Sequence, residues 1–299
     1  MNEGDIRQVT VISGKGGTGK STIIASIAAC LKDKAILADA DVDAADLYLL
    51  FEPEQSEGFD FYGLRKAKIN QELCTECGIC LETCRFEAIS KDFEVIQTRC
   101  EGCAACHHLC PISAIDMLDN VSGKYFISDT RIGKLVHAKL HPGEESSGLL
   151  VAEVRKVAKQ TAENQNRDLV LIDGSPGIGC PVISSLVGVD MAIIVTEPTL
   201  SGYHDLDRIL QLLEQFKIPG YIVINRYDIN EEIAQKIESD FENTFPIVTK
   251  IPYNPIFVQA MIEKKSVLEV ETEDKDVLQI KKMIIELSNF ILKKLKLDD

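Results

Sequence analysis

The chain has 299 residues, a formal net charge of −15 and an apolar content of 45%. These values exclude a disordered chain and suit one large α/β domain with a small insertion. The strong acidity leaves no broad basic face for nucleic acid or an anionic bilayer, so we expect neither nucleic-acid binding nor membrane attachment.

The N-terminus lacks the layout of a signal peptide, because no basic stretch is followed by an apolar one in MNEGDIRQVTV. No uninterrupted apolar run approaches the length of about 18 residues that a spanning helix needs. Eight of the ten cysteines fall in two runs with the spacing C-x-x-C-x-x-C-x-x-x-C, which favours metal ligation in a reducing compartment. We therefore expect a cytoplasmic protein.

The first predicted element is a strand at residues 9–12 that leads into a glycine-rich loop, GKGGTGKS, and then a helix at residues 22–29. The loop fits the phosphate-binding pattern G-x-x-x-x-G-K-[ST], in which backbone N–H groups and the helix N-terminus attract phosphate. Lys20 is placed to reach the outer phosphates, and Ser21 to ligate Mg²⁺. The sequence thus predicts ATP or ADP contacts at Gly14, Lys15, Gly16, Gly17, Thr18, Gly19, Lys20, Ser21 and Thr22.

Lys15, directly after the first glycine, makes the loop resemble the deviant Walker A loop of the MinD, ParA, Mrp and nitrogenase iron protein family. The resemblance implies an ATPase that acts as a sandwich dimer, either a homodimer or a heterodimer with a related ATPase. In that family the extra lysine reaches the nucleotide of the other subunit, which implies a catalytic role for Lys15.

A buried parallel strand is predicted at residues 34–40, and carboxylates follow at its end. Open α/β sheets place their chemistry beyond the carboxyl ends of strands. By resemblance to the family, Asp41 is the catalytic residue that positions the attacking water, and Asp39 helps to order the magnesium shell. Asp43 and Asp46 either join this site or are solvated caps of the next helix.

The two cysteine runs lie about 26 residues apart and form an internal repeat that resembles a bacterial two-cluster ferredoxin. In such ferredoxins the fourth cysteine of each run ligates the other [4Fe–4S] cluster. The resemblance implies cluster I on Cys74, Cys77, Cys80 and Cys110, and cluster II on Cys100, Cys103, Cys106 and Cys84. Two structural zinc sites are the alternative. Arg85 stands where a proline is usual, and His107 and His108 are interpreted as surface or packing residues.

We assign residues 61–128 to the inserted ferredoxin domain, and residues 1–60 and 129–299 to the P-loop ATPase domain. After the insertion the sequence predicts a strand at 133–140, a helix at 148–165 and a strand at 168–173. Asp173 ends that strand and has the magnesium-holding Walker B position. The following Gly174 to Gly177 resembles the D-x-P-P-G switch of the family, with Ser175 in place of one proline.

Cys180 has an offset from Asp173 similar to that of a cluster ligand in the nitrogenase iron protein. It is either a ligand of a cluster bridging two subunits, a small buried thiol, or a residue at the subunit boundary. Cys30, among alanines and isoleucines, is interpreted as packing.

Two more strands are predicted at residues 190–197 and 221–225, and an amphipathic helix at 276–297. By resemblance, Asn225 and Arg226 read adenine, and Pro252 and Tyr253 form a second wall of its site. Tyr253 as an ordinary loop aromatic is the alternative. The apolar residues of the last helix follow the spacing of a helix docked on its own domain.

Alternating strands and helices predict a mostly parallel, doubly wound α/β sheet that carries the ferredoxin-like insertion. The main functional hypothesis is a dimeric ATPase whose nucleotide state gates electron transfer through the two clusters to a redox partner. One alternative is Mrp-like assembly or delivery of an iron–sulfur cluster to an accepting protein. Another is a MinD/ParA-like positioning ATPase with structural or sensory clusters.

Overall fold

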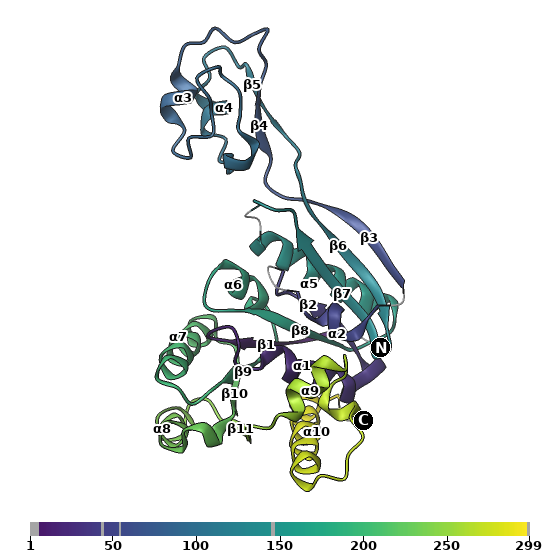
Figure 1. Cartoon of the computed structure of the whole chain (residues 1–299). Helices are drawn as coiled ribbons and strands as arrows, with labels where there is room; N and C mark the ends of the chain where they lie inside the picture. Colours follow the sequence, from purple (N-terminus) through teal and green to yellow (C-terminus); the bar gives the residue numbers. More distant parts are fainter. Residues whose placement is uncertain (1–5, 43–44, 54, 145–146, 298–299) are drawn as a thin grey trace.

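The structure, a computed structural model, describes residues 6–42, 45–53, 55–144 and 147–297. These residues form a nine-stranded sheet and a separate two-stranded sheet. Figure 1 shows the large sheet and its helices in one body, and the small sheet in a lobe at the end of a long ribbon.

The large sheet has the strand order β11-β10-β9-β1-β8-β2-β7-β6-β3. Its strands from β11 to β7 are parallel, which confirms the predicted mostly parallel sheet. The inner ones, such as β9, are nearly continuous apolar runs, as strands covered on both faces must be. Their bounds are β1 (Arg7–Ser13), β2 (Ala35–Asp39), β7 (Gly133–Leu140), β8 (Leu169–Pro176), β9 (Met191–Thr196), β10 (Gly220–Asn225) and β11 (Ile247–Ile251).

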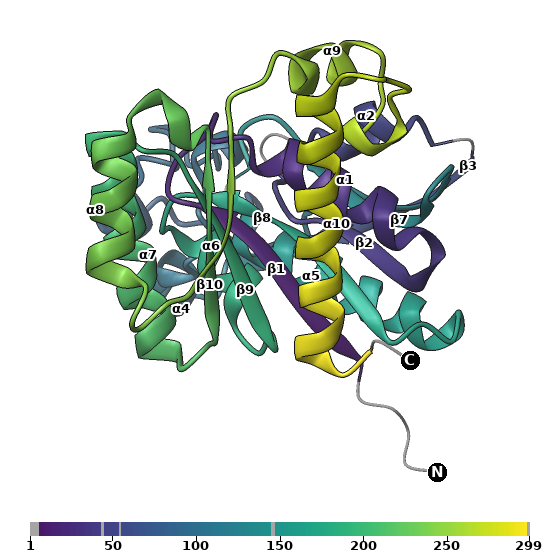
Figure 2. The ribbon, with the colours of Figure 1, turned by 90° about the horizontal axis from the view of Figure 1, so that it is seen from below.

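Helices cover both faces of this sheet (Figure 2). Successive strand residues point to opposite faces, so Val11 packs with one set of helices and Ile12 with the other. With Val11 lie α1 (Lys20–Leu31), α2 (Leu47–Phe51), α9 (Ile256–Ile262) and α10 (Lys275–Leu295). With Ile12 lie α5 (Ser147–Asn164), α6 (Cys180–Leu186), α7 (Leu200–Phe216) and α8 (Glu231–Phe241).

The last helix, α10, is docked on its own domain, with Ile280, Ile284, Leu287 and Ile291 buried in the core. Among the described residues, none of the helices is both long and apolar enough to cross a membrane. Four short 3₁₀ segments complete the helical elements, namely η1 (Lys32–Lys34), η2 (Gln97–Arg99), η3 (Tyr227–Ile229) and η4 (Val267–Glu269).

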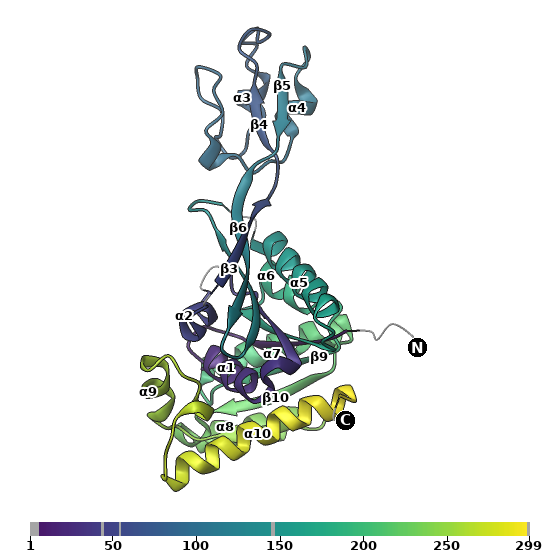
Figure 3. The same cartoon turned by 90° about the vertical axis from the view of Figure 1, so that its right-hand side faces the viewer.

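An antiparallel ribbon closes one edge of the sheet, and the sequence patterns did not predict it. It consists of β3 (Gln55–Tyr62) and β6 (Val121–Thr130), and β6 also pairs antiparallel with β7. Most of β3 is exposed, so it lacks the apolar run that marked the parallel strands. Figure 3 shows this ribbon leading from the large body to the small lobe.

The small lobe is built from two similar halves. Strands β4 (Lys66–Ile69) and β5 (Ile115–Leu118) pair antiparallel, and helices α3 (Ile79–Thr83) and α4 (Ala105–Leu109) pack beside them. Each helix follows a residue with positive φ, Gly78 at 83° and Ala104 at 61°. The repeat in the sequence is therefore also a repeat in the structure.

Candidate functional site

The phosphate-binding loop lies between β1 and α1, and the backbone requires glycine at several of its positions. Gly17 and Gly19 have φ values of 80° and 88°, a region that favours glycine. A Cβ at Gly19 would also collide with the Asn225 amide, and one at Gly14 with Asp205. The loop therefore has the open backbone that phosphate cradles need.

Lys20, at the start of α1, lies in a buried cluster of carboxylates. Its Nζ forms an ion pair with Asp173 Oδ1 and lies 3.5 Å from Asp41 Oδ2. Burial lowers the pKa of Lys20, but the neighbouring carboxylates, led by Asp173, outweigh it and leave that pKa raised. Burial raises the pKa of Asp173, and the charge of Lys20 opposes that shift without cancelling it. The predicted phosphate ligand and the predicted magnesium-side acid thus lie together.

Asp39 is fully buried beside Asp173, its partner across β2 and β8. Its Oδ1 accepts from the Asp41 backbone N–H and its Oδ2 from that of Leu47, each at 3.2 Å. Burial, and then the charge of Asp173, raise the pKa of Asp39 well above its usual range. Asp39 therefore fastens the predicted switch loop to the end of its strand.

The start of α2 differs from the capping interpretation. Asp46 occupies the N-cap position, but its side chain accepts no capping hydrogen bond, and the Leu47 N–H is bound by Asp39 instead. Capping by Asp46 is therefore wrong, and Asp43 lies outside the described residues. The alternation of sequence patterns could not show that the cap is supplied from the preceding strand.

Several buried polar atoms around the loop have no partner. Among the described residues these include the Thr18 hydroxyl, Asp173 Oδ2 and Asn225 Oδ1. Unpartnered buried polar atoms are costly, so a cluster of them beside a phosphate loop fits a polar ligand. The donor set, an ammonium, hydroxyls and carboxylates, fits a magnesium nucleotide.

Lys15 is held within its own subunit. Its Nζ lies 2.7 Å from Glu197 Oε1 and 2.9 Å from the Ser201 hydroxyl. Arg226 Nη1 lies 3.3 Å from the other carboxylate oxygen, Glu197 Oε2. Glu197 was not predicted from the sequence, because no motif links an acid that follows a strand to a distant lysine.

The residues predicted to contact adenine lie on two neighbouring strand ends. Asn225 is buried and its Nδ2 donates to the Thr18 carbonyl at 2.7 Å, so it also supports the phosphate loop. Tyr253 is 54% exposed, and its backbone N–H donates to Asp228 in the loop after β10. Pro252 precedes it and is half-buried. The adenine contacts remain a prediction.

The segment after Asp173 is tied to its neighbours by polar contacts. The Ser175 hydroxyl donates to the Ala40 carbonyl at 2.9 Å, and the Gly177 N–H donates to the Ser13 carbonyl at 2.9 Å. The serine that replaces a proline therefore links the ends of β8 and β2. Cys180 is exposed at the first residue of α6, so its interpretation as a buried thiol is wrong. Cys30 is half-buried.

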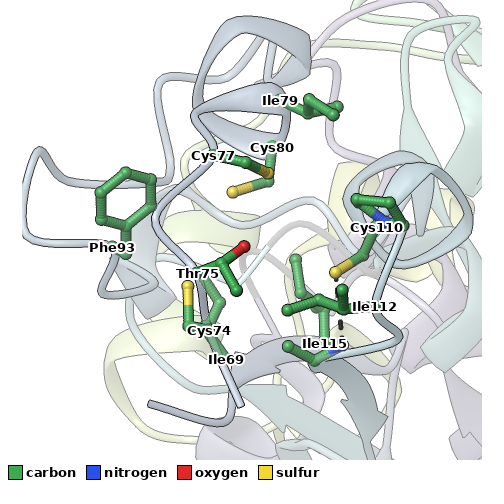
Figure 4. A pocket seen from close by; sticks show the side chains of 12 residues that line it. Ile69, Cys74, Thr75, Cys77, Ile79, Cys80, Phe93, Cys110, Ile112 and Ile115 are labelled. Atoms are coloured by element: carbon green, nitrogen blue, oxygen red, sulfur yellow. Dashed lines mark hydrogen bonds between the residues drawn. The ribbon is translucent and has the colours of Figure 1, made fainter. Parts of the chain in front are cut away.

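The eight clustered cysteines line two separate cavities in the lobe. The first is lined by Cys74, Cys77, Cys80 and Cys110, and Figure 4 shows their sulfur atoms beside the same space. The second is lined by Cys84, Cys100, Cys103 and Cys106. Each cavity thus takes three cysteines from one run and the fourth from the other, and its remaining walls are mainly apolar.

Equivalent cysteines have equivalent surroundings in the two cavities. The Ala114 N–H donates to Cys110 Sγ at 3.2 Å, and the Ala88 N–H donates to Cys84 Sγ at 3.3 Å. Burial raises the pKa of Cys80 and that of Cys106. His108 is exposed, while the His107 ring binds the Ile115 carbonyl, as expected of surface and packing residues.

Within the described ranges, no three His, Cys, Asp or Glu side chains lie close enough to hold a single metal ion. Four thiolates around a cubane each bind a different iron, so they lie farther apart than ligands of one ion. The donor set of each cavity, four thiols inside apolar walls with an N–H directed at sulfur, fits a cubane cluster.

The parallel sheet and the loop between β1 and α1 are those of a P-loop nucleotide-binding protein. Residues 9–267 match the family described as the CobQ/CobB/MinD/ParA nucleotide binding domain. The chain belongs to this family, and it is a P-loop ATPase.

Relatives support this assignment. Uncharacterized protein MJ0578 of Methanocaldococcus jannaschii is 34% identical over 256 residues, covering 83% of this chain and 90% of that protein. Uncharacterized protein MJ0579 of the same organism is 29% identical over 292 residues, covering 95% and 97%. MinD of Pyrococcus horikoshii, solved with Mg-ADP, has a TM-score of 0.62 at 17% identity and covers 98% of each chain. At that identity the likeness shows the fold alone.

Proposed function

We propose that this chain is an ATP-hydrolysing iron–sulfur protein that acts as a dimer, in which the nucleotide state gates electron transfer through two [4Fe–4S] clusters to a partner protein. The single observation that carries the proposal is the pair of cysteine cavities, each completed by the fourth cysteine of the other run. Two cubanes supply one-electron carriage when bound, and this chain would hold them through all eight thiols.

The division of the chain follows from this proposal. Residues 61–128 form the iron–sulfur domain, and residues 1–60 and 129–299 form the ATPase, with the β3–β6 ribbon shared at the boundary. We place the protein in the cytoplasm.

In the ATPase part, the residues around the loop would bind a magnesium nucleotide. Lys20 would hold the outer phosphates, and Ser21 and Asp173 would hold the magnesium and its water shell. Asp39 orders the switch loop through the Asp41 and Leu47 backbone. Asp41 would then orient water, and its place beside Lys20 supports that role.

Contacts at the junction between the two parts support gating rather than a lobe on a flexible tether. Lys66 on β4 forms a 2.7 Å ion pair with Glu144 Oε1, in the loop between β7 and α5. Asn120, which joins β5 to β6, donates to Glu144 Oε2 at 3.0 Å. We call these three residues the junction cluster. Because the junction cluster joins the base of the lobe to the ATPase body, it supports a coupling between the two parts.

Helix α5 lies beside the helix that follows the segment after Asp173. A Cβ on Gly148, near the start of α5, would lie 3.4 Å from Cys180 Cβ at the start of α6. The α5 and α6 helices pack together, and α6 follows the segment after Asp173. Helix α5 also packs against β7, which pairs with β6 of the ribbon, so a change at the γ-phosphate side of the nucleotide has a packed route toward the lobe.

A second candidate is a MinD/ParA-like positioning ATPase with structural or sensory clusters. The comparisons favour this alternative over electron transfer, because the chain belongs to the family that includes MinD and ParA, and its relatives include MinD of Bacillus subtilis, 32% identical over 119 residues that cover 37% of this chain and 44% of that protein. Mrp-like cluster delivery has less support, because each cavity already offers a full set of four cysteines. Two relatives in one organism also keep a heterodimer with a related ATPase as a proposal.

Redox titration with and without a non-hydrolysable ATP analogue tests the gating. Coupling is reciprocal, and a typical coupling of about 1–3 kcal/mol would shift a one-electron potential by several tens of millivolts, since about 59 mV is a tenfold change. We expect such a shift in at least one cluster, and a matching change in nucleotide affinity on reduction. Identical potentials and affinities would contradict gating and leave the positioning ATPase.

A further inference from the structure

We infer that Glu197 is a positioning residue for the ATPase reaction: it holds Lys15 inside its own subunit until the dimer forms, with Arg226 in place to neutralise it when Lys15 leaves. The inference rests on the proposed dimer, in which Lys15 acts on the nucleotide of the other subunit. Glu197 directly follows Thr196, the last residue of the strand β9.

The geometry shows two cations sharing one carboxylate. Lys15 takes one oxygen of Glu197 at 2.7 Å and Arg226 takes the other at 3.3 Å. The Glu197 side chain is only 14% exposed, whereas those of Lys15 and Arg226 are 31% and 36% exposed. The acid is thus the fixed member of this group, and the two cations lie on its solvent side.

The turn that carries Glu197 is itself well fixed. The Thr199 N–H donates to the Glu197 carbonyl at 2.8 Å, and the Thr199 hydroxyl accepts from the Gly202 N–H at 3.0 Å as the N-cap of α7. A side chain at Gly202 would collide with the Glu197 carbonyl. Lys15 also donates to the Ser201 hydroxyl in the first turn of α7, so its ammonium has a preformed binding position.

Arg226 changes the cost of releasing Lys15. Removing the partner of a mostly buried charge is strongly unfavourable when nothing compensates it. With Arg226 at the second oxygen, Glu197 keeps a counter-charge after Lys15 swings away. Arg226 directly follows Asn225, which binds the Thr18 carbonyl of the phosphate loop, so the nucleotide site and this group share one strand end.

The ion pair between Glu197 and Lys15 lowers the fraction of subunits that are competent to dimerise. When only a fraction of a protein is competent, its apparent affinity falls by that fraction. A partly exposed ion pair changes such an equilibrium by about two- to fivefold. Glu197 would therefore raise the protein concentration needed for dimerisation, and Arg226 would lower it.

The test measures dimerisation by analytical ultracentrifugation in a saturating non-hydrolysable ATP analogue with Mg²⁺, together with ATP turnover against protein concentration. We expect Glu197→Gln to lower the midpoint concentration about two- to fivefold and Arg226→Gln to raise it. Asp207→Asn is the matched control, because this carboxylate lies on α7 and binds Gln211 rather than Lys15, so its midpoint should stay at the parental value. In a Lys15→Ala background, Glu197→Gln should no longer shift the midpoint.

Midpoints that move in the same direction for Glu197→Gln and Arg226→Gln would overturn the inference, because they would indicate a merely structural role. An unshifted Glu197→Gln midpoint in a protein that dimerises would overturn the inference while sparing the dimer. A parental protein that stays monomeric at every concentration would overturn the proposed dimer and this inference together.

Discussion

Breaking the junction cluster should loosen the lobe from the ATPase body. Lys66 and Glu144 are 11% and 15% exposed, and Lys66 also donates to the Gln97 carbonyl at 2.9 Å. Among the residues that the structure describes, Glu144→Gln leaves the Lys66 ammonium with neutral partners only. Exposed pairs contribute up to about 1 kcal/mol and loss of one partner of a buried pair costs about 3–5 kcal/mol. We expect about 2 kcal/mol for this intermediate site.

Hydrogen exchange at the junction measures this cost directly. The His141 N–H donates to the Ser122 carbonyl at 2.9 Å and the Gly63 N–H to the Asn120 carbonyl at 3.1 Å, so both amides report on local opening. A loss of about 2 kcal/mol makes opening about 30-fold more frequent, since about 1.4 kcal/mol is tenfold. Amides of β1 and β8 in the core should keep their protection.

The neighbouring pair Arg65–Asp119 provides the matched control, because both side chains are 66% exposed. Asp119→Asn should change junction protection by less than about 1 kcal/mol. Equal hydrogen-exchange protection of the junction amides in the parental protein and in Glu144→Gln would show that the junction cluster does not hold the lobe. The lobe would then be joined to the ATPase body by a flexible tether.

The pH dependence gives the same test without a mutation. Burial raises the pKa of Glu144, but its hydrogen bond from Lys66 and its other partners outweigh burial and leave that pKa below its usual value of 4.5. A lowered pKa in the folded state adds stability that is present above the usual value and is lost as the pH falls through the lowered one. Junction protection should therefore fall at acid pH in the parental protein and lose this dependence in Glu144→Gln.

Three further outcomes are expected. Lys20→Ala should weaken nucleotide binding itself, which calorimetry would measure. Asp41→Ala should retain much of the binding and lose turnover, which phosphate release would measure. Parental turnover in Asp41→Ala would contradict the proposed role of Asp41. Cys110→Ser should remove the cluster held mainly by the first cysteine run, and Cys84→Ser should remove the other cluster. Electron paramagnetic resonance spectra of the reduced variants would show which signal is lost. Loss of the same signal in both variants would contradict the crossed ligand sets. Burial lowers the pKa of His137 to about 4, so the free energy of unfolding should fall as the pH drops from the usual 6.5 toward 4, because only the unfolded state gains the proton in that range. His137→Phe should remove this part of the decline in thermal unfolding.

The sequence was sufficient for the parallel core of the fold. Continuous apolar runs, such as the one within residues 168–173, are covered on both faces, so their pattern identifies them without tertiary information. The ribbon of β3 and β6 was not predicted, because its two strands pair across the insertion and are far apart in the sequence. Most residues of β3 are also exposed to solvent, so the strand has no apolar run.

Motifs likewise predicted the parts of the site that are local in the chain. The phosphate loop and the cysteine runs have fixed spacings, and each run folds into one half of the lobe. Pairs formed over long separations, such as Lys15 with Glu197 or Lys66 with Glu144, leave no spacing to detect. The exposure of Cys180 depends on the packing of α6 and was equally beyond the sequence.

We propose that this ATPase of the CobQ/CobB/MinD/ParA family carries two cubane clusters in its lobe. The decisive measurement is the content of iron, acid-labile sulfide and zinc in anaerobically purified protein. We expect about eight iron and about eight sulfide per chain, because each closed cubane contains four of each. About two zinc ions per chain with no sulfide would contradict the proposal.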